Sequence, residues 1–257
     1  MGLRRRADEL VTAAAIVFSI LGSAALGLKL PDYIQVCRKG IPNLDECIKE
    51  HAAPVIGRLK DGIPEFNVPP MDPLYVRKIR VENGGLGISM QSGNVRIHGL
   101  SKSKPIGQWM NKVSPPSFRW NLFAPRLEIN SNYEVDGRIL LLPIVGKGNL
   151  NITLTDVDYV YSFECDLERR EDGKEYLVPT TSHIDFKSSR MYTTLSNLFN
   201  GNKLLGNQMN YFLNENWREI QKEFGPPIAD ALAKAIRKIV NAITRKVPLD
   251  AIFPEEV

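Results

Sequence analysis

Few residues in this sequence have the types and the spacing that chemistry requires. The three histidines, His51, His98 and His183, are scattered, and the cysteines form no C-x-x-C pair, so we predict no zinc site. Neither a G-x-S-x-G nucleophile elbow nor an H-E-x-x-H motif is present. Asp156 and Asp158 alternate along a predicted strand, and we expect both carboxylates to face solvent. The sequence therefore predicts a protein that is not an enzyme and needs no metal or cofactor.

The N-terminus has the three-part pattern of a secretory signal peptide. A basic stretch, Met1–Arg6, precedes the apolar run Leu10–Leu21 and a small-residue stretch that ends at Gly27. The apolar run is shorter than the roughly 20 residues that a membrane-spanning helix needs. We therefore expect cleavage of residues 1–27 and a single secreted, extracellular domain over residues 28–257. An uncleaved membrane anchor is the alternative.

Secretion changes how the three cysteines are interpreted, because disulfides persist in oxidising compartments. Cys37 and Cys47 bracket the short segment CRKGIPNLDEC, and we expect them to form a disulfide. Cys165 has no partner left within the chain. Its place on the apolar phase of a strand favours a buried free thiol in a monomer. A dimer joined through a Cys165 disulfide is the alternative.

The composition is that of a globular protein, with 43% hydrophobic and 24% charged residues. The formal net charge of +4 falls to +3 without residues 1–27, which carry three arginines and two acidic residues. No basic stripe interleaved with aromatic residues is present. The sequence therefore predicts no nucleic-acid partner.

From Tyr75 to about Phe199, apolar residues recur with the period of two that is typical of β-strands. Strict alternation over residues 126–143 predicts a long antiparallel strand or a hairpin. A change of apolar phase near Thr155–Asp156 predicts a β-bulge and hence strong curvature. Pro143–Gly148 are interpreted as a turn between two long strands. Shorter strands are predicted at residues 75–81, 86–90, 95–100, 176–186 and 191–199.

Helical spacing occurs at both ends of this strand-rich region. A helix is predicted over residues 44–59, with Asn43 as its N-cap and a kink at Pro54. After Gly201 a long apolar stripe continues to Val247, with an interruption at Gly225-Pro226-Pro227. Its polar face is basic. We expect the apolar face to pack on the sheet, with transient contact with a membrane surface as the alternative.

One N-x-S/T sequon, Asn151-Ile-Thr153, is present in the chain. Asn151 falls on the polar phase of its strand. We therefore predict a glycosylation site whose glycan points into water.

The apolar faces either close into an ordinary core or leave a tunnel between the sheet and the helix. Pockets for hydrophobic ligands are mostly apolar and carry a few polar groups that fix orientation. The phases of the strands and the helix predict that a tunnel would be lined by Tyr133, Val135, Ile139, Leu141, Ile152, Tyr159, Phe163, Met209 and Phe212. Tyrosine hydroxyls, that of Tyr133 in particular, are the predicted polar handles.

Five segments extend this interpretation: LPDYIQVCRKGIPNLDEC, GIPEFNVPPMDPL, YEVDGRILLLPIVGKGNLNITL, LFNGNKLLGNQMNYFLNENWREI and KVPLDAIFP. In their order and content the chain resembles the insect haemolymph juvenile hormone binding protein family, and within it the takeout-like branch. The resemblance covers essentially the whole of residues 28–257. Hormone-binding members often have a second disulfide, which Cys165 cannot form within one chain, and this favours the takeout-like branch.

The resemblance implies an α+β fold of the tubular lipid-binding (TULIP-like) type. It has a short N-terminal helix and a long, highly curved antiparallel sheet wrapped around a long C-terminal helix. It also implies the Cys37–Cys47 disulfide and an apolar tunnel that holds a small lipid-like ligand, such as a terpenoid or a fatty acid. The expected function is that of a secreted carrier without catalysis. The alternatives are a signalling protein that acts through its surface, and a protein that transfers lipid between membranes.

Overall fold

The computed structural model describes residues 29–83 and 88–255, so the predicted signal peptide lies outside the described residues. The helices are α2 (Leu44–Arg58), α3 (Lys203–Glu215), α4 (Trp217–Thr244) and α5 (Leu249–Ile252), with 3₁₀ turns η1 (Leu59–Asp61), η2 (Pro64–Phe66), η3 (Leu100–Lys102) and η4 (Phe199–Gly201). The strands are β1 (Leu74–Asn83), β2 (Ile88–His98), β3 (Lys104–Pro105), β4 (Met110–Val113), β5 (Pro116–Ile139), β6 (Leu142–Arg169), β7 (Glu175–Lys187) and β8 (Arg190–Leu195).

The strands form one antiparallel sheet in the order β1-β2-β5-β6-β7. The short strands β3 and β4 pair with β5. Strand β8 pairs with β6 on the edge of β6 that faces away from β5. The centre of the sheet is the long ladder between β5 and β6, which runs from Ser117↔Glu164 to Ile139↔Leu142. Both strands alternate buried and exposed residues along most of their length, as expected for a sheet with one wet face.

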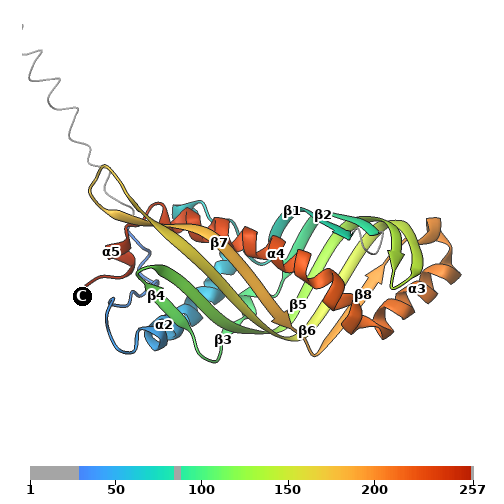
Figure 1. Cartoon of the computed structure of the whole chain (residues 1–257), viewed down its shortest axis with the longest axis horizontal. Helices are drawn as coiled ribbons and strands as arrows, with labels where there is room; N and C mark the ends of the chain where they lie inside the picture. Colours follow the sequence, from blue (N-terminus) through green and yellow to red (C-terminus); the bar gives the residue numbers. More distant parts are fainter. Residues whose placement is uncertain (1–28, 84–87, 256–257) are drawn as a thin grey trace, which may run out of the picture.

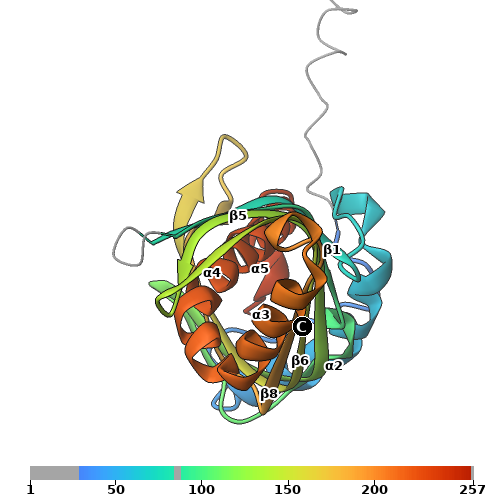
Figure 2. The same cartoon turned by 90° about the vertical axis from the view of Figure 1, so that its right-hand side faces the viewer.

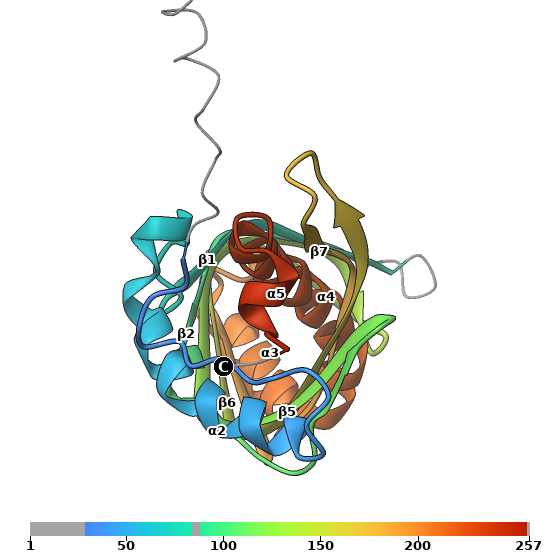
Figure 3. The ribbon, with the colours of Figure 1, turned by 90° about the vertical axis from the view of Figure 1, so that its left-hand side faces the viewer.

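The sheet curls around the C-terminal helices. Figure 1 shows α4 running along the sheet, with α3 at one end of the molecule and α2 and α5 at the other. In the two end-on views the sheet curves around α4, with α3 at the near end in Figure 2 and α5 at the near end in Figure 3. This arrangement confirms the predicted α+β fold, with its curved antiparallel sheet, long C-terminal helix and short N-terminal helix.

The turn between β5 and β6 lies at Leu140–Leu141, so the predicted turn at Pro143–Gly148 is wrong. Both leucines have a positive φ, 46° and 78°. The glycines of β6 have another role, because a Cβ on Gly148 would lie 2.4 Å from the carbonyl oxygen of Ser196. Glycine inside a strand often marks such a close approach of another backbone segment.

The predicted change of apolar phase occurs at Asp156, which has a φ of 48°. The expected cause, an extra residue in one strand, is wrong, because pairing keeps its register from Ala124↔Val157 to Arg126↔Thr155. Both strands shift their buried face together. At this point β6 changes its partner from β8 to β7. A bulge does occur in β2, between Gly93 and Arg96.

Helix α4 continues through Gly225-Pro226-Pro227, where the sequence predicted an interruption. The break lies earlier, at Asn216, whose side-chain amide donates to the carbonyl oxygen of Phe212. A Cβ on Gly225 would lie 3.0 Å from the ring of Phe186, so the glycine lets α4 approach β7 closely. Tertiary packing of this kind overrides local helix propensity.

Two smaller predictions also differ from the structure. Asn43 precedes α2, but its side chain makes no capping hydrogen bond. The predicted strand over residues 191–199 ends at Leu195, because Asn197, Phe199 and Asn200 adopt a positive φ. Within the described ranges, no helix has the length and apolar character needed to cross a membrane.

Candidate functional site

The space between the curled sheet and α4 is not completely filled. Three adjoining cavities lie along it, and we name them by position. The α3-side cavity has a volume of about 80 Å³ and is bordered by the sheet, by α3 and by the N-terminal half of α4. The α2-side cavity, of about 330 Å³, lies between the sheet, α2, α4 and the N- and C-terminal segments.

The linking cavity, of about 40 Å³, lies between these two. It shares Ile129, Leu154, Phe186 and Ile228 with the α3-side cavity. It shares Leu100 and Tyr159 with the α2-side cavity. The three cavities therefore form one series along the axis of the molecule.

The lining of this series is almost wholly apolar. Among the residues described, no Asp, Glu, Lys or Arg borders any of the three cavities. The α2-side cavity has the volume and the apolar walls that are typical of sites for small hydrophobic ligands, and the other two cavities are smaller. An ionised group would be costly in such a space, because nothing there compensates its charge.

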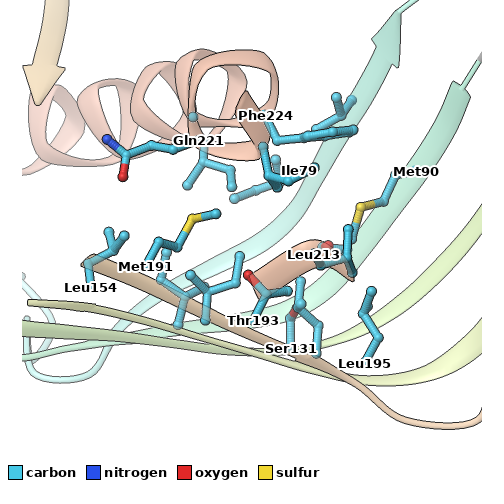
Figure 4. A pocket seen from close by; sticks show the side chains of 18 of the residues that line it. Ile79, Met90, Ser131, Leu154, Met191, Thr193, Leu195, Leu213, Gln221 and Phe224 are labelled. Atoms are coloured by element: carbon cyan, nitrogen blue, oxygen red, sulfur yellow. The ribbon is translucent and has the colours of Figure 1, made fainter. Parts of the chain in front are cut away.

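Four polar side chains interrupt the apolar wall of the α3-side cavity: Ser92, Ser131, Thr193 and Gln221. Ser131 on β5 and Thr193 on β8 are 7% and 6% exposed, and neither hydroxyl oxygen has a hydrogen-bond partner. Figure 4 shows both on the sheet side, with Gln221 and Phe224 of α4 on the facing side. Buried polar atoms are normally hydrogen-bonded, so these two need an explanation.

The α2-side cavity has an aromatic wall with its own hydroxyls. Phe118 and Phe163 stack with ring centroids 4.7 Å apart. Burial raises the pKa of Tyr159 to about 12, and its hydroxyl donates to Ser103 Oγ at 2.8 Å. Burial also raises the pKa of Tyr161, whose hydroxyl has no hydrogen-bond partner.

Some of the predicted tunnel residues border the cavities, and others do not. Ile139 and Ile152 border the α3-side cavity, and Tyr159 and Phe163 border the α2-side cavity. Three buried residues and one partly buried residue lie outside the lining of all three cavities: Tyr133, Val135, Met209 and Phe212. Leu141 was predicted wrongly, because it sits in the β5–β6 turn and is 82% exposed.

Tyr133 has a structural contact that the sequence did not indicate. Its hydroxyl donates to the carbonyl oxygen of Ser196 at 2.7 Å, and burial raises its pKa to about 12. The hydroxyl therefore holds the segment after β8 against the sheet, and it is not free to orient a ligand as predicted.

Sequence reasoning missed Ser131, Thr193 and Thr244, although a signal was present. Ser131 and Thr193 occupy the apolar phase of their strands, as polar residues among apolar neighbours. Thr244, whose hydroxyl is also buried without a partner, borders the α2-side cavity from the end of α4. A hydroxyl on the apolar phase is the pattern to look for.

The cysteines behave as predicted. Cys37 and Cys47 form a disulfide, and Cys165 is a buried free thiol. Burial raises the pKa of the Cys165 thiol to about 12. The described residues contain one group that could hold a metal ion, formed by His51 and the two disulfide cysteines. While the disulfide is intact those sulfurs are not thiolates, so they are poor ligands.

Asn151 lies on the outer side of the sheet, as its polar phase predicted, and is partly buried. Its side-chain amide donates to Glu128 Oε1 at 3.1 Å and to Asn130 Oδ1 at 2.8 Å. Glycosylation of Asn151 stays a prediction.

A curled antiparallel sheet around a long helix, with an apolar interior, is the fold called tubular lipid-binding (TULIP-like). The family model described as "Haemolymph juvenile hormone binding protein (JHBP)" matches residues 14–254. The chain belongs to this family, in its takeout-like branch, as the sequence motifs predicted.

Known relatives agree with this assignment. The chain is 30% identical to "Circadian clock-controlled protein daywake" of Drosophila melanogaster over 220 residues, which cover 82% of this chain and 85% of the relative. The Drosophila yakuba protein of the same description is 29% identical over the same shares. The crystal structure of Epiphyas postvittana Takeout 1 has the same fold, with a TM-score of 0.76 at 24% identity, covering 86% of this chain and 99% of Takeout 1.

Proposed function

We propose that this protein is a secreted carrier that binds a small hydrophobic ligand in its apolar interior and performs no catalysis. The observation that supports this most directly is the series of three cavities, on whose walls the described residues include no Asp, Glu, Lys or Arg. Membership of a family described by hormone binding supports the same function. The ligand would be shielded from water by the sheet and α4, and released intact.

Secretion and domain organisation are parts of the same proposal. Residues 1–27 would be removed as a signal peptide, and residues 28–257 would form one carrier domain. The word "haemolymph" in the family description and the Cys37–Cys47 disulfide both support an extracellular location.

The interior offers enough apolar surface for useful affinity. Each buried CH₂ group contributes about 0.8 kcal/mol, so a ligand with about ten methylenes gains about 8 kcal/mol before the costs of association. That gain needs no ionic contact, and the described cavities supply none.

Native mass spectrometry of the secreted protein tests the carrier function. We expect an additional apolar mass that leaves when the protein unfolds, and that organic extraction recovers. An empty protein that also fails to take up fatty acids, terpenoids and quinones after delipidation would contradict the proposal. That result would favour a protein that acts through its surface, with the interior as a core.

Transfer between membranes is a second candidate, favoured by one groove. The edge strand β1 and helix α4 border it with basic residues that include Lys78, Arg80, Lys234 and Lys238, beside Asp230. A basic surface of this kind would attract anionic lipid. Co-sedimentation with vesicles that contain anionic lipid, at low salt, tests this candidate. Failure to bind them would exclude transfer by direct membrane contact and leave the soluble carrier.

A further inference from the structure

We propose that Ser131 and Thr193 form the polar recognition site of the α3-side cavity, and that they bind the neutral, hydrogen-bonding part of an amphiphile such as a long-chain alcohol, ester or ketone. This inference rests on the proposed carrier function and specifies the chemical class of the ligand.

The first support is that both hydroxyls lack a hydrogen-bond partner in an apolar cavity. Each side chain is more than nine-tenths buried and each oxygen is without a hydrogen bond. A buried hydroxyl without a partner destabilises the folded protein, whereas alanine or valine at the same place would not. A ligand that supplies the missing hydrogen bond removes this cost.

The second support is that Thr193 is held in position by its neighbours. The side chain of Asn214 on α3 accepts from the backbone N–H of Thr193 at 2.9 Å, and donates to its carbonyl oxygen at 2.7 Å. On the other side, Thr193 pairs with Ile152 of β6. The hydroxyl of Thr193 is therefore presented from a fixed backbone, as expected for a preorganised binding group.

The third support is the placement of the two residues on the sheet. Ser131 pairs with Leu150, and Thr193 with Ile152, so they lie on opposite sides of β6. Neighbouring strands are about 4.8 Å apart, which places the two backbones about 10 Å from each other across the sheet. Each hydroxyl therefore contacts a different part of the ligand, and one headgroup atom does not bind both.

The charge of the site decides between kinds of headgroup. The described walls of the α3-side cavity contain no cation, so an ionised carboxylate would be buried without compensation. A hydroxyl, a carbonyl or an ether oxygen needs only the hydrogen bonds that Ser131 and Thr193 offer. The site therefore favours neutral amphiphiles over ionised fatty acids of the same length.

Competition binding on the delipidated, disulfide-intact protein tests this inference. Hexadecanol, hexadecane and palmitate are each used to displace the fluorescent apolar probe N-phenylnaphthylamine at pH 8. We expect the unmodified protein to bind hexadecanol at least about 10-fold more tightly than palmitate. Equal affinity for the two would overturn the preference for a neutral headgroup.

The variants Ser131→Ala and Thr193→Val test the two residues. Hexadecanol has one oxygen and therefore reaches one of the two hydroxyls, so we expect one variant to weaken its binding about 3- to 10-fold, the other to leave it unchanged, and both to leave hexadecane binding unchanged. The matched control is Ser182→Ala, because Ser182 Oγ is also buried without a partner but borders a separate groove. The control should change neither affinity.

A stability measurement separates recognition from a structural role. Without ligand, Ser131→Ala and Thr193→Val should keep or raise the melting temperature, because each removes an unpaired buried hydroxyl. Variants that melt lower and lose hexadecanol and hexadecane binding equally would overturn the inference. Failure of every probe to bind the unmodified protein would instead contradict the carrier function itself.

Discussion

The polar side chains inside this protein fall into two groups. Tyr133 and Tyr159 have hydroxyls with partners, and these hydroxyls join segments that are far apart in the sequence. Ser131, Thr193 and Tyr161 have hydroxyls without partners, and all three border cavities. The same chemical group thus has a structural role in the first case and is available to a ligand in the second.

Tyr133→Phe should affect stability and not ligand binding. The change removes the hydrogen bond to the carbonyl oxygen of Ser196, and we expect a loss of about 1 kcal/mol in the free energy of unfolding. Urea denaturation measures the loss. A variant of full stability that binds hexadecanol more weakly would contradict this assignment and restore the tyrosine as a polar handle.

Cys165 should be unreactive in the folded protein. Burial raises the pKa of its thiol from 9.0 to about 12, so at pH 8 almost no thiolate is present to attack a disulfide reagent. We expect a slow reaction with Ellman's reagent that becomes fast in denaturant, and a monomer on a non-reducing gel. Fast labelling of the folded protein would contradict the burial.

The raised pKa also predicts how stability changes with pH. The unfolded thiol ionises near its ordinary pKa, whereas the folded thiol stays protonated up to about pH 12. The unfolded chain is therefore favoured as pH rises above 9, and stability is lost between these two values. Compared with Cys165→Ala, the unmodified protein should lose more stability between pH 8 and pH 10 in urea denaturation. Parallel changes in the two proteins would contradict this prediction.

At the scale of elements, close approaches between distant segments explain why Gly148 lies inside a strand and Gly225 inside a helix. Periodicity identified the strands and the helices, but the bulge from which it predicted the curvature of the sheet is absent at Thr155–Asp156. It also could not identify contacts between elements, and these decided two predicted interruptions. Gly148 faces Ser196, and Gly225 faces Phe186. The exposed Leu141 occupies a turn that local propensity would assign to glycine.

The approach at Gly148 can be tested by adding one methyl group. In Gly148→Ala the new Cβ would lie 2.4 Å from the backbone oxygen of Ser196, so the segment after β8 must move. We expect a loss of more than about 2 kcal/mol in the free energy of unfolding. Gly93→Ala is the control, because a Cβ there meets nothing within 4 Å. Equal effects in the two variants would show that lost chain flexibility, and not the contact, explains the result.

At the scale of the whole molecule, two cavities lie toward opposite ends of one helix, and their walls differ. The α3-side cavity is enclosed by the sheet and the C-terminal helices. The α2-side cavity depends on the N-terminal segment and α2, which the Cys37–Cys47 disulfide joins. The family could be predicted from sequence motifs, and the apolar interior could be predicted from the alternation of apolar residues along the strands. The division of that interior into cavities could not be predicted, because residues of a packed core and residues that line a cavity follow the same alternation.

Removal of the Cys37–Cys47 disulfide should destabilise mainly the end of the molecule where α2 lies. Closing a loop of this length contributes about 2–3 kcal/mol in the chain-entropy account, so the Cys37→Ser, Cys47→Ser variant should lose about that much stability. We also expect increased hydrogen exchange in α2, with β8 and α3 unchanged. Uniform loss of protection across both ends would show that the two cavities are not independent.

The linking cavity should affect how long a ligand stays bound as well as how tightly it binds. A ligand long enough to occupy both end cavities must pass Ile129, Leu154, Phe186 and Ile228, which border the narrow section on one side. These side chains belong to the sheet and to α4, so the passage widens only when several of them change rotamer together. For such a ligand the residence time would be governed by these collective motions, and the two end cavities would govern how tightly it is held. A carrier built in this way can hold its ligand for longer than its affinity alone would require.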